Sequence, residues 1–111
     1  MLKDLADYDG LAKTWDSLGY AHHHLGQYTQ AVACQQRALA LYRDLGDRYN
    51  ETEILTHLGD THHVAGNHQD ARAAWREALT ILNDIQHPNA ETISRKLDAL
   101  DAVPIAQPPD G

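Results

Sequence analysis

The stretch WDSLGYAHHHLGQYTQAVACQQRALALYRDL, residues 15–45, decides the fold because the chain repeats it forty residues later. The second copy, LTHLGDTHHVAGNHQDARAAWREALTILNDI, spans residues 55–85 and aligns with the first without a gap at ten identical positions. The identical pairs are Leu18/Leu58, Gly19/Gly59, His22/His62, His23/His63, Gly26/Gly66, Ala31/Ala71, Ala33/Ala73, Ala38/Ala78, Leu39/Leu79 and Asp44/Asp84. A fixed internal period of this length indicates a repeat architecture.

Apolar residues recur in each copy at the three- and four-residue steps that place them on one helical face. In the first helix of copy one, the residues on this face are Leu11, Trp15, Leu18, His22 and Leu25. Gly26 and Gly66 fit the left-handed residue that closes a helix. Gly19, Ala31 and Ala38 recur at the same phase in copy two, so we expect the two helices of each copy to cross closely there. Each copy is therefore predicted to be a helical hairpin.

The predicted fold is all-α: an α-solenoid of two helical hairpins with a C-terminal capping helix, in a single domain over residues 1–101. Residues 1–10 are predicted to be the end of a preceding repeat, residues 11–46 repeat one and residues 50–86 repeat two. Residues 88–101 are predicted to form the capping helix and residues 102–111 a disordered tail. Asp4 and Leu5 align with Asp44 and Leu45, which is why the first ten residues are assigned to an earlier repeat. Asn50, with Glu53 three residues later, is predicted to cap the first helix of repeat two.

Composition excludes several classes of function. The chain has 111 residues and a net charge of −7 with no cluster of Lys or Arg, which disfavours nucleic acids and anionic membranes as partners. Cys34 is the only cysteine, so neither an intramolecular disulfide nor a CxxC metal site can form. No signal peptide or membrane-spanning stretch is recognised, and we expect a cytoplasmic protein.

The pattern W-x-x-L-G-x-x-H at residues 15–22, followed by Ala31 and Ala38, resembles the tetratricopeptide repeat in its longer form of roughly forty residues. The resemblance covers residues 12–45 and 52–85. The sequence departs from the family's pattern at Leu55 (usually Trp), His22 and His62 (usually Tyr), Gln35 (usually aromatic, as Trp75 is in copy two), and Arg43 and Asn83 (usually Pro). Without that proline, the second helices can continue to Leu45 and Ile85.

The two copies with their ending QHP…RKL are also similar to the C-terminal repeats of actinobacterial transcriptional regulators of the antibiotic-regulatory (SARP) type. Those proteins combine a DNA-binding domain, a nucleotide-binding ATPase and tetratricopeptide repeats. The similarity implies a regulatory or interaction segment without catalytic activity. The phosphate-binding pattern GxxxxGK[ST] is not found in this sequence, so it does not contain the ATPase part.

The adjacent histidines His22, His23 and His24 do not form a metal site by themselves. Neighbouring residues point about 100° apart around a helix, so the three rings diverge. His57 lies five and six residues before His62 and His63, which does not match the i, i+4 spacing of helical zinc ligands. We therefore predict no metal and no cofactor, and expect His22 and His62 to be packed within the hairpins. Convergence of His23 with His57 or His63 across the repeats is left open.

The resemblance to tetratricopeptide repeats implies that one face of each first helix lines a concave groove. The residues at this phase are Lys13, Asp16, Ser17, Tyr20, His23, His24, Glu53, Thr56, His57, Asp60 and His63. The family's carboxylate clamp needs Lys, Asn and Arg at positions that here hold Asp16, Tyr20, Glu53 and His57. A polar or basic protein segment, or a neighbouring domain of the same parent protein, is the expected partner. Histidines beside Asp16 and Asp60 would make such binding sensitive to pH; the alternative is that they are simple solvated polar residues.

Three functions remain to be distinguished. The first is a non-catalytic interaction module that binds a protein segment in the groove. The second is a structural spacer that forms a homodimer through an apolar N-terminal edge, composed of Leu2, Leu5, Leu11 and Trp15. The third, an enzyme or metal protein built on the histidines, is disfavoured because Cys34 aligns with Ala74 and no Ser-His-Asp arrangement can be assigned.

Overall fold

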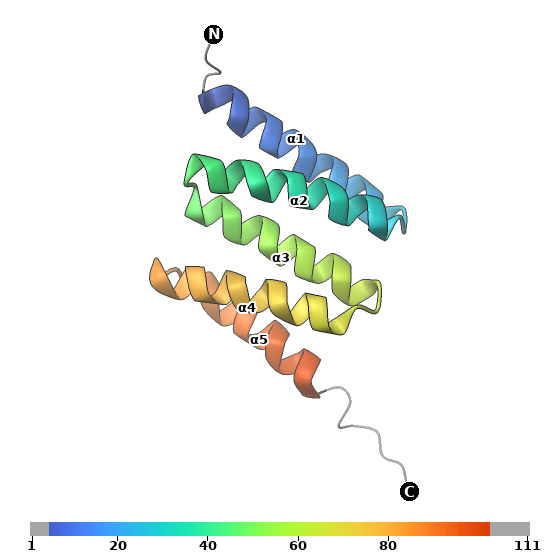
Figure 1. Ribbon diagram of the computed structural model, residues 1–111. Helices are drawn as coiled ribbons and strands as arrows, with labels where there is room; N and C mark the ends of the chain where they lie inside the picture. The colour runs from blue at the N-terminus through green and yellow to red at the C-terminus, as the bar shows by residue number, and fades with distance from the viewer. Residues whose placement is uncertain (1–4, 103–111) are drawn as a thin grey trace, which may run out of the picture.

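Five helices stacked in chain order make up the structure, a computed structural model that describes residues 5–102, with side chains for residues 7–101. They are α1 (Leu5–His24), α2 (Tyr28–Leu45), α3 (Arg48–Val64), α4 (His68–Asp84) and α5 (Asn89–Ala102). Successive helices run in opposite directions down the stack (Figure 1). The described residues are all-α, which confirms the predicted fold class.

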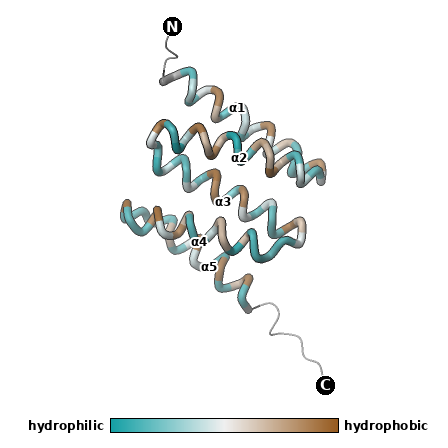
Figure 2. The backbone as a smooth tube through the Cα atoms, viewed as in Figure 1, coloured by the Kyte–Doolittle hydropathy of each residue, from teal (hydrophilic) through white to brown (hydrophobic). Residues whose placement is uncertain are grey.

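Extensive contacts join consecutive helices only: α1 with α2, α2 with α3, α3 with α4, and α4 with α5. Thus α1 and α2 form one hairpin, α3 and α4 form the second, and α5 covers the end of the stack. Hydrophobic and hydrophilic stretches alternate along the helices (Figure 2), as expected where each helix buries one face. The largest fully buried side chains include Ile54 and Leu82, which lie in one continuous core with Trp75, Ile93 and Leu97.

The turns that close the two hairpins have the same conformation. Gly26 and Gly66 have φ of +77° and +89°, in the left-handed region predicted for them. In each turn the next residue donates a backbone hydrogen bond five residues back, from Gln27 to His22 at 2.9 Å and from Asn67 to His62 at 2.8 Å. This pattern is the Schellman motif, and it turns the chain so that the second helix packs against the first.

The predicted close crossings are confirmed. Ala31, Ala38, Ala71 and Ala78 are fully buried. A Cβ added at Gly59 would overlap the indole ring of Trp75, and one added at the equivalent Gly19 would lie 2.8 Å from Cγ of Gln35. The glycine on the first helix thus makes room for a large side chain on the second helix in both hairpins.

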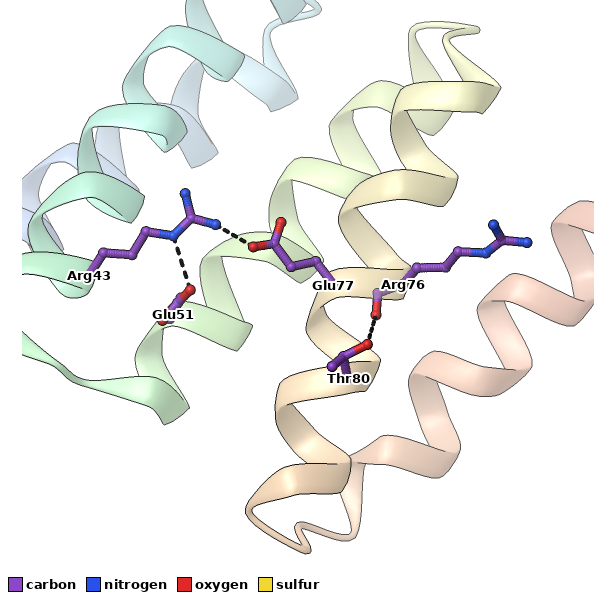
Figure 3. A network of polar contacts seen from close by, with 5 residues as sticks. All are labelled: Arg43, Glu51, Arg76, Glu77 and Thr80. Carbon is purple, nitrogen blue, oxygen red and sulfur yellow. Dashed lines mark hydrogen bonds and ion pairs between the residues drawn. The ribbon is translucent and has the colours of Figure 1, made fainter.

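One arginine ties the two repeats together. Arg43 Nε donates to Glu51 Oε2 at 3.0 Å, and Arg43 Nη2 donates to Glu77 Oε2 at 2.6 Å, so the guanidinium links α2, α3 and α4 (Figure 3). Glu51 is buried, and a buried carboxylate without a partner would be destabilising. Arg43 stands where the family usually has proline, and α2 continues to Leu45 as predicted.

Several boundaries differ from the sequence-based expectations. Residues 5–10 form the first turns of α1 and not a separate end of a preceding repeat; Gly10 is tolerated there because it weakens a helix by only about 1 kcal/mol. The prediction that Asn50 caps repeat two is wrong, because α3 begins at Arg48 and Asp47 Oδ1 accepts the hydrogen bond from Asn50 N. Helix α5 extends to Ala102, and the rest of the expected tail, residues 103–111, lies outside the described residues.

The apolar stripe expected to be buried along α1 is partly exposed. Leu11, Leu18 and Leu25 are 42%, 43% and 70% exposed, whereas Leu58, the equivalent of Leu18 in repeat two, is buried. Helix α3 packs on the preceding α2, but no helix precedes α1 within residues 5–102. Of the predicted N-terminal edge, Leu2 lies outside the described residues. None of the helices in the described range is both long and apolar enough to cross a membrane.

We predict that replacing Gly10, Gly19 and Gly59 by alanine, one at a time, separates two effects on stability: the helix propensity of the residue and the close crossing of the helices. Gly10→Ala meets no atom within 4 Å and should stabilise the protein by up to about 1 kcal/mol. Gly59→Ala should destabilise it by about 1–3 kcal/mol because Trp75 must move. Gly19→Ala should fall between them, since the Gln35 side chain is flexible. Urea denaturation of the three variants measures this order; a Gly59→Ala protein as stable as Gly10→Ala would show that the crossing is not closely packed.

Candidate functional site

A cleft of about 340 Å³ lies between α1 and α3. Its lining residues are Asp16, Tyr20, His23 and His24 from α1, His57 and Asp60 from α3, and Gln35 from α2. We call this the α1–α3 cleft. Six of these seven residues belong to the predicted groove. Their spacing along the helices thus identified side chains of two repeats that lie at the same cleft.

Two hydrogen bonds across the repeats hold the walls of the cleft together. His57 Nδ1 donates to Asp16 Oδ1 at 3.0 Å, and His23 Nδ1 is hydrogen-bonded to Thr61 Oγ1 at 2.8 Å. Both bonds join α1 to α3, which have no extensive backbone contact with each other. The histidines therefore position the first helix of repeat one relative to that of repeat two.

Asp16 also controls the charge of His57. The hydrogen bond to Asp16 raises the pKa of His57 above its ordinary value of 6.5; burial acts in the opposite direction, and the negative charges of Asp16, Glu53 and Asp60 add to the increase. The hypothesis of a pH-sensitive groove thus has a structural basis at His57. His23 has the neutral Thr61 as its partner instead of a carboxylate.

Aromatic rings line the mouth of the cleft. The Tyr20 side chain is 66% exposed, and its ring lies edge-to-face against that of His24, with centroids 4.2 Å apart. The ring of His23 lies 5.1 Å from that of His24. Exposed aromatic side chains beside a polar cleft are enriched where proteins bind one another.

The remaining predicted groove residues lie elsewhere. Lys13 and Ser17 line a separate hollow on α1, where Lys13 pairs with Asp9 at 3.1 Å. Glu53 and Thr56 line a second cleft, of about 160 Å³, between α3 and α5.

His63 is not in the α1–α3 cleft. Its ring is exposed and lies 5.6 Å from that of Trp75 and 5.3 Å from that of His68. The physical reason is that His63 follows His57 by six residues, which places it about 120° around the helix. The prediction that His63 and His57 share one face of the helix is therefore too coarse to place both side chains in one cleft.

His22 and His62 were expected to pack inside the hairpins. Both are partly buried, and His22 Nδ1 donates to the Gln27 side-chain oxygen at 2.7 Å. The Nδ1 atom of His62 is buried without a hydrogen-bond partner among the described residues. No group of three or more His, Cys, Asp or Glu side chains in the described part of the chain is placed to hold a metal ion.

Two residues of the site were not predicted. Lys96 on α5 pairs with Asp60 at 3.1 Å, and its Nζ lies 5.6 Å from the centre of the Trp75 ring. Gln35 forms part of the cleft lining although it is only 2% exposed. The signal for Gln35 was present in the sequence, since a polar residue stands at the position where repeat two has Trp75; nothing in the repeat pattern indicated Lys96.

Comparison with known proteins identifies one family. The family model described as tetratricopeptide repeat matches residues 10–84, about two thirds of the chain. The comparisons with curated proteins and with solved structures gave no significant match.

We predict that Asp16→Asn lowers the pKa of His57, as measured by NMR titration of the imidazole. Glu91→Gln, which removes a carboxylate from an exposed pair with Arg95 on α5, is the control and should leave the His57 titration unchanged. Because the pKa is raised on folding, the stabilisation of His57 by Asp16 is fully present below the ordinary value of about 6.5 and is lost as the pH rises through the folded value. The difference in free energy of unfolding between the original protein and Asp16→Asn should therefore become smaller as the pH rises. An Asp16→Asn protein in which the pKa of His57 is unchanged would contradict this assignment.

Proposed function

We propose that this chain, which belongs to the tetratricopeptide repeat family, is a non-catalytic interaction module that binds a protein segment in the α1–α3 cleft. Tetratricopeptide repeats generally mediate protein–protein interaction and are not enzymatic modules. The cleft supports the proposal because it combines a concave surface, the exposed Tyr20 side chain and the two carboxylates of its lining. Asp16 and Asp60 place carboxylates in its lining and the chain carries a net charge of −7, so a polar or basic partner segment fits best.

The structure offers little support for the alternative of catalysis. Cys34, the only cysteine of the sequence, is buried on α2. A buried thiol in apolar surroundings behaves as a small packed residue rather than as a reactive group. Of the three histidines that line the cleft, His57 and His23 are hydrogen-bonded to Asp16 and Thr61.

We further propose that the module belongs to a larger cytoplasmic transcriptional regulator, in which another domain of the same chain is one possible occupant of the cleft. This proposal depends on the similarity of the repeats and their ending to regulators of the antibiotic-regulatory type. It fails if the coding sequence that neighbours this segment contains neither a DNA-binding domain nor an ATPase domain.

A second candidate function is self-association through the exposed apolar face of α1. Leu11, Leu18 and Leu25 lie seven residues apart on one face, whereas Leu58, the repeat-two equivalent of Leu18, is buried in the hydrophobic core. Helix α3, which carries Leu58, packs on the preceding α2, and no helix takes that place beside α1 within residues 5–102. A second copy of the chain could take that place, which would make the protein a homodimeric spacer.

We predict that peptides selected from a random decapeptide library on the immobilised chain depend on the cleft. Tyr20→Ala and His57→Ala should each weaken their binding by about tenfold or more, the effect of losing an interface residue worth about 1.4 kcal/mol. His63→Ala is the matched control, because His63 is an exposed histidine outside the cleft, and should bind as the original chain does. Circular dichroism checks that each variant is folded; equal binding to the cleft variants and the control would reject the cleft as the binding surface.

The self-association candidate predicts a concentration-dependent dimer in sedimentation velocity. Leu18→Glu should abolish the dimer because it places a charge in the apolar face. Val64→Glu changes another exposed apolar residue, at the end of α3, and should leave the dimer intact. A chain that remains monomeric at all concentrations, or a dimer unaffected by Leu18→Glu, would exclude this function.

A further inference from the structure

Gln35 lines the α1–α3 cleft and has a buried, unpaired acceptor. Its side chain is 2% exposed, and its Oε1 atom has no hydrogen-bond partner among the described residues. The side chain passes over Gly19, where even a methyl group would come within 2.8 Å of Gln35 Cγ, and it contributes to the cleft lining. Burying a polar group without a partner is unfavourable, so an orphaned amide oxygen at this position calls for an explanation.

Repeat two provides an internal comparison. Trp75 occupies the position forty residues after Gln35 and packs against Gly59 as Gln35 packs against Gly19. The Trp75 Nε1 atom donates to the Thr56 carbonyl oxygen at 3.3 Å, so its polar atom is satisfied within the chain. The same fold can therefore accommodate an internally satisfied residue at this position, and repeat one has instead a residue whose buried oxygen has no partner among the described residues.

The cleft that Gln35 lines contains two carboxylates, the Tyr20 ring and three histidines. The internal hydrogen bonds of Asp16 and Asp60 use Oδ1 in each case, to His57 and to Lys96, so within the described part of the chain the second carboxylate oxygens are not engaged. Tyr20 and His24 supply ring surfaces at the mouth. A planar group that carries positive charge and several N–H donors matches this combination, because it can donate to the oxygens and stack on the rings. The guanidinium group has five such donors in a fixed plane.

We propose that the floor of the α1–α3 cleft is a socket for the guanidinium group of an arginine side chain carried by the partner segment. Gln35 Oε1 accepts a hydrogen bond at the floor, Asp16 and Asp60 supply the counter-charges, and Tyr20 covers the flat face. A volume of about 340 Å³ is at the lower end of the range of about 300–1,000 Å³ for ligand pockets. It therefore suits one inserted side chain with its flanking backbone. This inference rests on the proposed function and adds the residue that the partner must bring.

The test uses three pentapeptides, acetyl-Gly-Ser-X-Ser-Gly-amide, in which X is arginine, lysine or the neutral arginine isostere citrulline. Each is titrated into the ¹⁵N-labelled chain and followed by NMR. The arginine peptide should shift the Gly19 and Tyr20 amides and the Gln35 side-chain amide. The lysine peptide should bind more weakly than the arginine peptide. The affinity of the citrulline peptide should be lower by about tenfold or more, because its hydrogen bonds are no longer charge-assisted.

Gln35→Met separates binding from packing. Methionine has a similar length and no amide oxygen, so the variant should lose about tenfold in affinity for the arginine peptide. Its thermal midpoint should be unchanged or raised by about 5 °C, because the unsatisfied oxygen has been removed. Gln36→Met, at the exposed neighbouring position, is the matched control and should change neither quantity.

Three results would overturn the socket: no saturable shifts with the arginine peptide, equal binding of the arginine and citrulline peptides, or a Gln35→Met protein that is destabilised but binds as before. The last result would make Gln35 a structural residue. If library-selected peptides lack arginine yet still depend on Tyr20 and His57, the socket fails while the interaction module stands. If no selected peptide depends on the cleft, the proposed function itself fails.

Discussion

The close crossing of two helices within each hairpin is the constraint on which the rest of this structure depends. It exists because Gly19 and Gly59 leave no side chain where Gln35 and Trp75 pass. The same crossing buries Ala31, Ala38, Ala71 and Ala78 completely, so small residues allow the two helices of each hairpin to approach closely. Interaxial distance follows the size of the residues at the contact. The continuous core of this chain, which has no phenylalanine, combines such small residues with Trp75 and aliphatic side chains.

Polar contacts join helices of different repeats, in addition to the close crossings made by small residues within each hairpin. Arg43 joins α2 to α3 and α4, while Asp16 and His57 join α1 to α3, and Asp60 and Lys96 join α3 to α5. Such directional bonds act together with the apolar core that spans both repeats in orienting one repeat on the next. The cleft is a consequence of this orientation, because the same side chains that set it also line the space between α1 and α3.

The forty-residue period was sufficient to predict the fold class, the two hairpins and the glycine turns, since each depends on local pattern. It also brought six residues of the cleft together, because helical phase is a local property. It failed for His63 and for the exposed face of α1. His63 was grouped with His57 although six residues place it about 120° around the helix. The exposure of Leu18 depends on whether a helix precedes α1, which is a property of the assembled stack. The salt bridge of Lys96 was out of reach because α5 does not belong to the repeat.

Extensive contacts limited to consecutive helices have a mechanical consequence. In a globular core, many elements must separate together before the chain can lengthen. Here each helix is held mainly by the one before it and the one after it, so the structure resists a pulling force one interface at a time. A load applied between the two ends would extend the protein in small steps and let it recoil through the same steps. Such a module would act as a soft spring between whatever it connects.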